Sequence, residues 1–295
     1  MSHWKTIILI LQEAEKMFSL FRMENYRFVR TRTVHVITAI LIAVTILGVV
    51  VSAMTMKDSA DAESENVSKS VDLNGGKAFV TVGGGNSTEL NICRIFTEDI
   101  APVMNMVFWG IIIAIYIYGE YKNGFVKSIG GQIPKKGMLC ASKMYIMAAY
   151  TLCMYAVEFV IVALTSLIYA SKYKVVFGFE PKYLIIWLAI FVLYMGISGL
   201  FILICTSGRS SAIGIGVAMI VGFGMTSLVY NLINWLLVKI GITSFNISMY
   251  MPDTIMQRMS LQTPTDGIVR AFVVGGVFTI ATICVSMILQ NKRDI

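Results

Sequence analysis

The sequence predicts an all-α integral membrane protein with six transmembrane helices. The chain is 57% hydrophobic and 14% charged, whereas a soluble domain carries roughly 25% charged residues. It contains several apolar runs of about 20 residues, the length that crosses ~30 Å of hydrocarbon at 1.5 Å per residue. Its basic residues flank these runs and do not cluster with aromatics on a soluble face, which argues against a nucleic-acid partner. We therefore expect lipid to be the main solvent.

The N-terminal region, residues 1–32, is predicted to be a cytosolic amphipathic segment. Its apolar run Thr6–Leu11 is too short to span a bilayer and lacks the features of a signal peptide. Four arginines follow within 22–32, and they suit a helix that lies in the plane of the lipid headgroups. Residues 33–295 then form the six-span domain.

Long apolar runs separate the remaining chain into spans and loops. The six predicted spans are Val34–Met54, Ala101–Tyr118, Met144–Ala170, Tyr183–Cys205, Ala212–Leu237 and Gly267–Leu289. Residues 55–99 form a long polar loop in which Lys77–Val82 alternates as a hairpin strand would. Residues 238–266 form an amphipathic loop, where we expect short helices in the outer interface.

Orientation follows from the lysines and arginines near the span ends. With the N-terminus inside, the cytosolic side receives the arginines of 22–32, the five lysines of 119–143, and Lys292 and Arg293. The loop 171–182 is also basic and falls outside, so the bias is modest. The counts favour cytosolic N- and C-termini.

The connection 119–143 is longer and more polar than a simple turn between spans requires. Tyr121, Phe125 and Ile129 lie near one face at helical spacing. A Gly-Gly pair then breaks the helix, and Pro134 suits the start of another. A short helix across the cytosolic mouth of two spans is typical of an element that transmits motion.

Catalytic and metal-binding patterns are missing from the sequence. His3 and His35 have no metal-ligand partner at helical spacing, and no phosphate-binding glycine loop occurs. The five cysteines are scattered without paired spacing, which favours neither a disulfide framework nor a zinc site. We expect no catalytic residues, no metal, and no nucleotide hydrolysis by this chain.

Glu158 is an acid deep inside an apolar run. A charge there costs at least ~2.5–3.5 kcal/mol, so the side chain should face protein or water, or carry a proton. It is either a polar site on a transport path or a neutral carboxyl bonded to a neighbouring helix. Asn105 allows the same two interpretations. Glycines in the fourth, fifth and sixth spans permit close helix packing.

Two short motifs resemble a known family. Residues 24–32 lead from an amphipathic segment into the first span, and a large external loop follows. Glu-Tyr-Lys-Asn-Gly at 120–124 and Ile-Pro-Lys-Lys at 133–136 then precede Lys143 and the third span. This arrangement resembles the permease subunits of type-2 ATP-binding-cassette (ABC) exporters, whose bacterial members move antimicrobial peptides, toxins, lipids or drugs.

The resemblance implies a coupling helix within 119–143 that docks on a separate ATPase subunit, and an external cap at 245–262. The residues implied in ATPase coupling are Glu120, Tyr121, Lys122, Asn123, Gly124, Phe125, Lys127 and Ile129. It further implies two ATPase copies that bind ATP and Mg²⁺, a second permease copy (homodimer or heterodimer), and a bacterial plasma membrane. Short bacterial peptide-toxin and bacteriocin exporters are similar, so we expect an amphipathic peptide as cargo.

Two other functions stay open. A self-sufficient secondary transporter or channel would be expected to have broken spans in inverted repeats with charges at the midplane, and Glu158 alone supports it. A non-transporting membrane sensor or scaffold would use the 55–99 loop to bind a ligand. Dependence of transport on an ATPase subunit separates these functions from the exporter.

Overall fold

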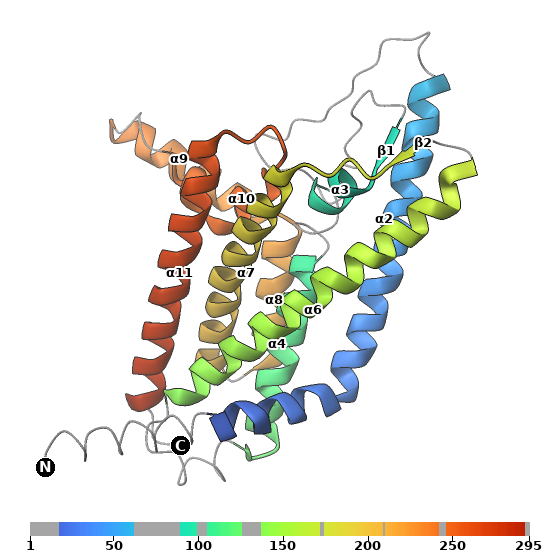
Figure 1. Ribbon diagram of the computed structural model, residues 1–295. Helices are drawn as coiled ribbons and strands as arrows, with labels where there is room; N and C mark the ends of the chain where they lie inside the picture. The colour runs from blue at the N-terminus through green and yellow to red at the C-terminus, as the bar shows by residue number, and fades with distance from the viewer. Residues whose placement is uncertain are drawn as a thin grey trace, which may run out of the picture.

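A computed structural model describes residues 18–61, 89–98, 105–125, 137–171, 174–208, 210–241 and 246–292. Within these ranges the chain is helical almost throughout, which confirms the all-α prediction (Figure 1). The exception is a parallel pair of three-residue strands, β1 (Glu89–Asn91) and β2 (Lys174–Val176), which aligns Leu90 with Val175. The expected strand at Lys77–Val82 lies outside the described residues.

Four of the described helices are long and apolar enough to cross a membrane. They are α2 (Arg32–Asp61), α6 (Met138–Ile168), α7 (Pro181–Gly208) and α11 (Thr265–Lys292). A bent pair, α8 (Ser211–Gly222) and α9 (Thr226–Lys239), makes five if it counts as one span. These helices are compatible with a membrane-embedded protein.

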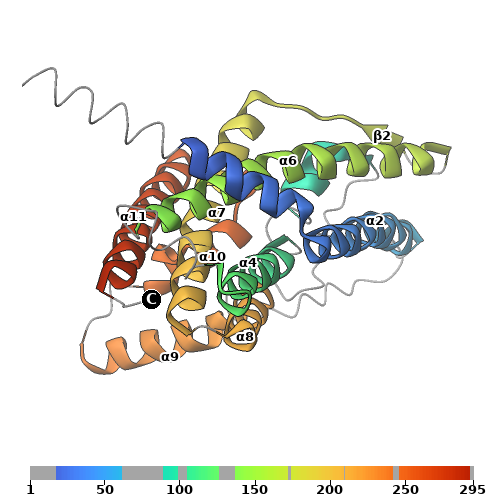
Figure 2. The same cartoon turned by 90° about the horizontal axis from the view of Figure 1, so that it is seen from below.

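The second predicted span corresponds to α4 (Asn105–Lys122), which is not among the four. Its 18 described residues end in the polar stretch Glu120–Lys122, and this end lowers the mean hydropathy of the helix. Most of its residues are nevertheless buried, because the helix packs against α8, α7 and α2 (Figure 2).

The prediction of one unbroken fifth span is wrong. The chain turns by 71° between α8 and α9, at a break where Gly224 adopts a φ of 70° that other residues rarely tolerate. After the break α9 buries none of its residues against the rest of the chain. The apolar composition of 212–237 concealed this turn, since more than half of the residues of α9 are apolar.

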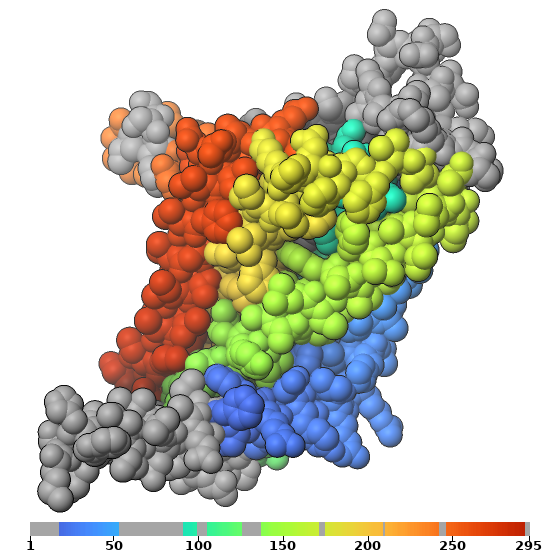
Figure 3. Space-filling view, viewed as in Figure 1, coloured from blue at the N-terminus to red at the C-terminus, as the bar shows by residue number. Residues whose placement is uncertain are grey.

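The helices surround α7, which packs against α11, α4, α6, α8 and α10. Helix α6 runs obliquely across the face of the molecule seen in Figure 3 and contacts α2, α7 and α11. The helical segment 18–30 lies across one end of the bundle (Figure 1). At this same end α4 and α11 finish and α6 begins.

Small residues hold α8 close to α4, as the glycines of the fifth span predict. A Cβ atom at Gly222 would collide with Val107, and one at Gly214 would collide with Ala114. These glycines are two turns apart, with the buried Ala218 between them, so they form one small-residue stripe on α8. Gly216, by contrast, faces open space.

Short helices occur in the loop 238–266, as expected. They are η3 (Ile247–Tyr250) and α10 (Pro252–Gln257). Two further short helices, α3 (Ile92–Arg94) and η2 (Tyr169–Ser171), lie elsewhere in the chain. Asp253 of α10 accepts hydrogen bonds from the hydroxyls of Thr226 (2.6 Å) and Tyr230 (3.1 Å) on α9. The Asn234 side chain of α9 donates to Asn246 before η3 at 2.8 Å. These bonds attach the polar face of α9 to η3 and α10.

Candidate functional site

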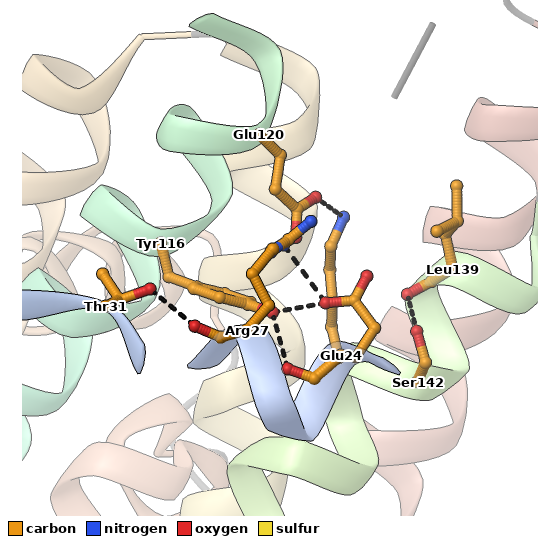
Figure 4. A network of polar contacts seen from close by, with 8 residues as sticks. Glu24, Arg27, Thr31, Tyr116, Glu120, Leu139 and Ser142 are labelled. Atoms are coloured by element: carbon orange, nitrogen blue, oxygen red, sulfur yellow. Dashed lines mark hydrogen bonds and ion pairs between the residues drawn. The ribbon is translucent and has the colours of Figure 1, made fainter. Parts of the chain in front are cut away.

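A group of charged and polar side chains, buried except for the half-buried Arg27, joins three segments at the end of the bundle where segment 18–30 lies (Figure 4). We call it the charged cluster: Glu24, Arg27, Tyr116, Glu120 and Lys143. Glu24 and Arg27 are one turn apart on segment 18–30. Tyr116 and Glu120 occupy neighbouring turns near the end of α4, on the same helix face. Lys143 comes from the first turns of α6.

Each acid of the charged cluster contacts a partner from another segment. Glu120 pairs with the Arg27 guanidinium and with Lys143, whose Nζ lies 2.6 Å from Glu120 Oε2. The Tyr116 hydroxyl donates a hydrogen bond to the Glu24 carboxylate. Arg27 Nη2 also lies 3.1 Å from Glu24 Oε2. Arg27 is therefore shared by the two acids, and Glu120 by the two cations.

The charges balance inside a buried site. Glu24 is 0%, Glu120 3% and Lys143 1% exposed, and the Arg27 side chain is 26% exposed. Two carboxylates and two cations therefore sum to zero at a largely buried site. Removing one member of such a set leaves an uncompensated buried charge. Burial, reinforced by the nearby Glu120, raises the pKa of Glu24 above its ordinary value, despite Arg27. Glu24 therefore accepts a proton more readily than an exposed glutamate does.

Aromatic rings extend the contact between the segments. Phe28 packs edge-on against Tyr116 of α4 and Tyr150 of α6, with ring centroids 5.1 and 5.2 Å away. The Arg27 guanidinium lies 3.8 Å above the ring of Phe125, at the start of the 119–143 connection. Segment 18–30, the end of α4 and the start of α6 thus form one packed unit.

The structure places the sequence-predicted coupling residues in different environments. Glu120 belongs to the charged cluster, and Tyr121 is half-buried against the core. Lys122 and Asn123 are exposed, Gly124 makes a turn with a φ of 68°, and Phe125 is half-buried. Lys127 and Ile129 lie outside the described residues. The described solvent-facing surface of this motif is therefore formed by Lys122 and Asn123.

Glu158 and Asn105, predicted separately as candidate pathway residues, lie in contact. The Asn105 Nδ2 group donates to Glu158 Oε2 at 2.5 Å, which links α4 to α6. Both side chains are buried. Nearby, Trp109 Nε1 donates to Ser198 Oγ at 2.8 Å and links α4 to α7. The polar atoms inside the bundle thus hold helices together.

Sequence reasoning missed Glu24, Arg27, Tyr116 and Lys143 as site residues. One signal was available, because Tyr116 and Glu120 are the correct distance apart to share a face of an otherwise apolar helix. Lys143 counted as one more loop lysine. Nothing local in the sequence indicates that α6 begins before it and buries it.

Comparison of the chain with protein-family models, curated proteins and solved structures gave no match. Among the described residues, no group of three or more His, Cys, Asp or Glu could hold a metal ion. The functional interpretation therefore depends on the geometry of the chain and on the motifs in its sequence. What the charged cluster does in the described structure is to tie segment 18–30, the end of α4 and the start of α6 together.

Proposed function

We propose that this chain is the transmembrane subunit of an ATP-driven exporter, which forms the translocation pathway and couples to a separate ATPase. The observation that carries the proposal is the charged cluster. It binds segment 18–30, the end of α4 and the start of α6 into one unit directly beside the predicted coupling motif. The motif resemblance at 120–124 and 133–136 supports the same function.

The proposed topology has six spans with both termini in the cytosol: α2, α4, α6, α7, α8 and α11. Helix α8 has 12 residues, which at 1.5 Å per residue gives about 18 Å, less than the ~30 Å of a bilayer core. Helix α9 and the cap that it binds would then occupy the outer interface. The modest excess of lysine and arginine on the other side supports this orientation.

The charged cluster would transmit motion because it ties both helices that flank the connection. Glu120 pairs with Lys143 and Arg27. An ATPase that pushes or pulls on the 119–143 connection would therefore move α4, α6 and segment 18–30 together. Such a rigid-body shift can move an equilibrium between inward-facing and outward-facing states.

The partners of this proposal are two ATPase subunits, which bind ATP and Mg²⁺, and a second permease copy. Membrane lipid would cover the apolar side chains exposed along α2, α6 and α11. The proposed cargo is an amphipathic peptide such as a toxin, antimicrobial peptide or bacteriocin. This choice of cargo depends on the family resemblance. The proposed location is the plasma membrane of a bacterium.

Co-purification with ATPase subunits encoded near this chain tests the proposal. The exposed pair is changed in Lys122→Glu/Asn123→Glu, and the control Lys292→Glu changes an exposed lysine at the same end of the bundle. We expect the wild type and the control to retain the ATPase and the double variant to lose most of it. Equal retention by all three proteins would contradict docking at this motif.

A second candidate function is supported by the break between α8 and α9, because broken spans occur in secondary transporters. In those proteins the break lines a substrate site at mid-membrane, whereas here α9 bonds to the cap and buries no residue. Transport by the purified chain without any ATPase would favour this second function.

A further inference from the structure

Glu158 is buried in α6 without a compensating charge. It is 0% exposed, and its contact with a described residue is the hydrogen bond that Asn105 donates to Oε2. The other oxygen, Oε1, has no hydrogen-bond partner in the described chain. No ion pair to Glu158 occurs among the described residues. One amide hydrogen bond is weak support for a full negative charge.

Glu120 provides the contrast within the same molecule. It is almost as buried, but Arg27 and Lys143 both pair with it. An ionised carboxylate inside the membrane costs several kcal/mol unless a cation or a proton neutralises it. Because Glu158 lacks the cations that Glu120 has, a ligand must supply the missing positive charge.

The aromatic rings around Glu158 restrict which positively charged ligand can bind there. Trp109 and Tyr150 stack face to face, with centroids 4.8 Å apart, and Tyr155 packs edge-on against Tyr194 at 5.9 Å. This stacking covers one face of each ring, and further rings crowd the pair: Tyr194 lies edge-on to Trp109 at 5.9 Å and Phe28 edge-on to Tyr150 at 5.2 Å, which leaves little open ring surface for an organic cation. A proton needs no such space.

The groups near Glu158 cannot replace that proton. Tyr150 and Tyr155 come from α6 itself, and Tyr194 comes from α7. Helix α4 contributes Asn105, which does not titrate. None of these side chains carries a positive charge at any pH.

We propose that Glu158 is a proton-binding site inside the membrane, occupied in the arrangement described here, with the proton on Oε1. When α4 and α6 separate and water reaches the site, the carboxylic acid transfers its proton to water and becomes a carboxylate. The occupied state follows from the contacts of Glu158 alone. The release step rests on the proposed transport cycle.

Infrared spectroscopy of the purified chain in lipid tests occupancy directly, through the carbonyl stretching band of a protonated carboxyl. The probe is Glu158→Gln, which keeps the shape and the hydrogen bond of the neutral acid. The control is Glu180→Gln, which changes an exposed glutamate. At neutral pH we expect Glu158→Gln to lose one acid band, and Glu180→Gln to lose carboxylate bands with all acid bands retained.

Two results would overturn the proposal. One is a Glu158→Gln spectrum that lacks carboxylate bands but retains every acid band of the wild type. The other is loss of folded protein in Glu158→Gln, because glutamine reproduces the uncharged form and should leave the unfolding midpoint unchanged. A pH titration of the acid band in the wild type needs no variant and should show it persisting at neutral pH, where an exposed glutamate is ionised.

The release step has its own test in the assembled transporter. While the site titrates, each rise of one pH unit increases the relative population of a state that has released one proton by about tenfold. ATP turnover should therefore vary with pH in the wild type and less in Glu158→Gln. Equal pH profiles would reject release and leave occupancy standing. If no ATPase associates with the chain, the proposed function fails while the infrared result still decides occupancy.

Discussion

Replacing Lys143 by methionine removes one cation from the charged cluster and leaves the shape of the side chain nearly unchanged. Lys143 is 1% exposed, and its Nζ lies 2.6 Å from Glu120 Oε2. The cluster then holds Glu24, Glu120 and Arg27, with a net charge of −1. Breaking a buried pair by removing one partner costs about 3–5 kcal/mol. The converse change, Glu120→Gln, leaves a net charge of +1 and should cost a similar amount.

The double variant Glu120→Gln/Lys143→Met separates charge imbalance from lost packing. Independent losses would sum to about 6–10 kcal/mol. The double variant restores a net charge of zero, however, because Glu24 and Arg27 remain paired at 3.1 Å. We therefore expect it to be more stable than either single variant.

Unfolding in mixed micelles of a mild detergent and sodium dodecyl sulfate, followed by tryptophan fluorescence, measures these free energies. Lys292→Met serves as the control, since this lysine is exposed near the end of α11, and it should change stability by less than about 0.5 kcal/mol. The reasoning is refuted if the effects of the two single variants add in the double variant. It is also refuted if Lys143→Met costs no more than the control.

Three further predictions concern other parts of the chain. Gly222→Leu should destabilise the fold by about 1–3 kcal/mol through a clash with α4, whereas Gly216→Leu, which faces open space, should be nearly neutral; thermal unfolding compares them. Asp253→Ala removes the acceptor for two hydroxyls of α9 and should accelerate amide hydrogen exchange in α9, and Asp266→Ala at an exposed site should not. The pKa of Glu24 is raised from its ordinary 4.5, so the folded state binds this proton more tightly than the unfolded state, and the contribution of Glu24 to stability falls as pH rises above 4.5. Glu24→Gln should flatten that part of the pH–stability profile. An unchanged slope would contradict the raised pKa of Glu24.

Hydrophobic patterning located the long helices well, because runs of apolar residues report directly on lipid or core contact. It failed at the fifth span, where Gly224 lies inside an apolar run and composition gives no sign of a turn. In the bent arrangement α9 forms hydrogen bonds with Asp253 and Asn246, which are distant in the sequence from the turn itself. A local pattern cannot encode that contact.

In the candidate site too, the sequence indicates single residues but not their contacts. Glu158 and Asn105 are each recognisable as polar residues in apolar runs, but their contact depends on how α4 and α6 cross. Glu120 stays a predicted ATPase-coupling residue, and the sequence did not predict that its side chain is buried. The sequence places it in a polar loop motif, whereas the helix continues past it and turns its carboxylate inward toward Arg27 and Lys143.

The most direct test of the proposed function is ATP-dependent transport of a fluorescent cationic amphipathic peptide into inside-out lipid vesicles. The vesicles contain the chain alone, its ATPase alone, or both together, and each preparation is measured with and without ATP. The exporter account predicts accumulation only when both proteins and ATP are present. Flux through the chain alone would indicate a secondary transporter or channel, and a stable complex without flux would indicate a sensor or scaffold; either result would contradict the account.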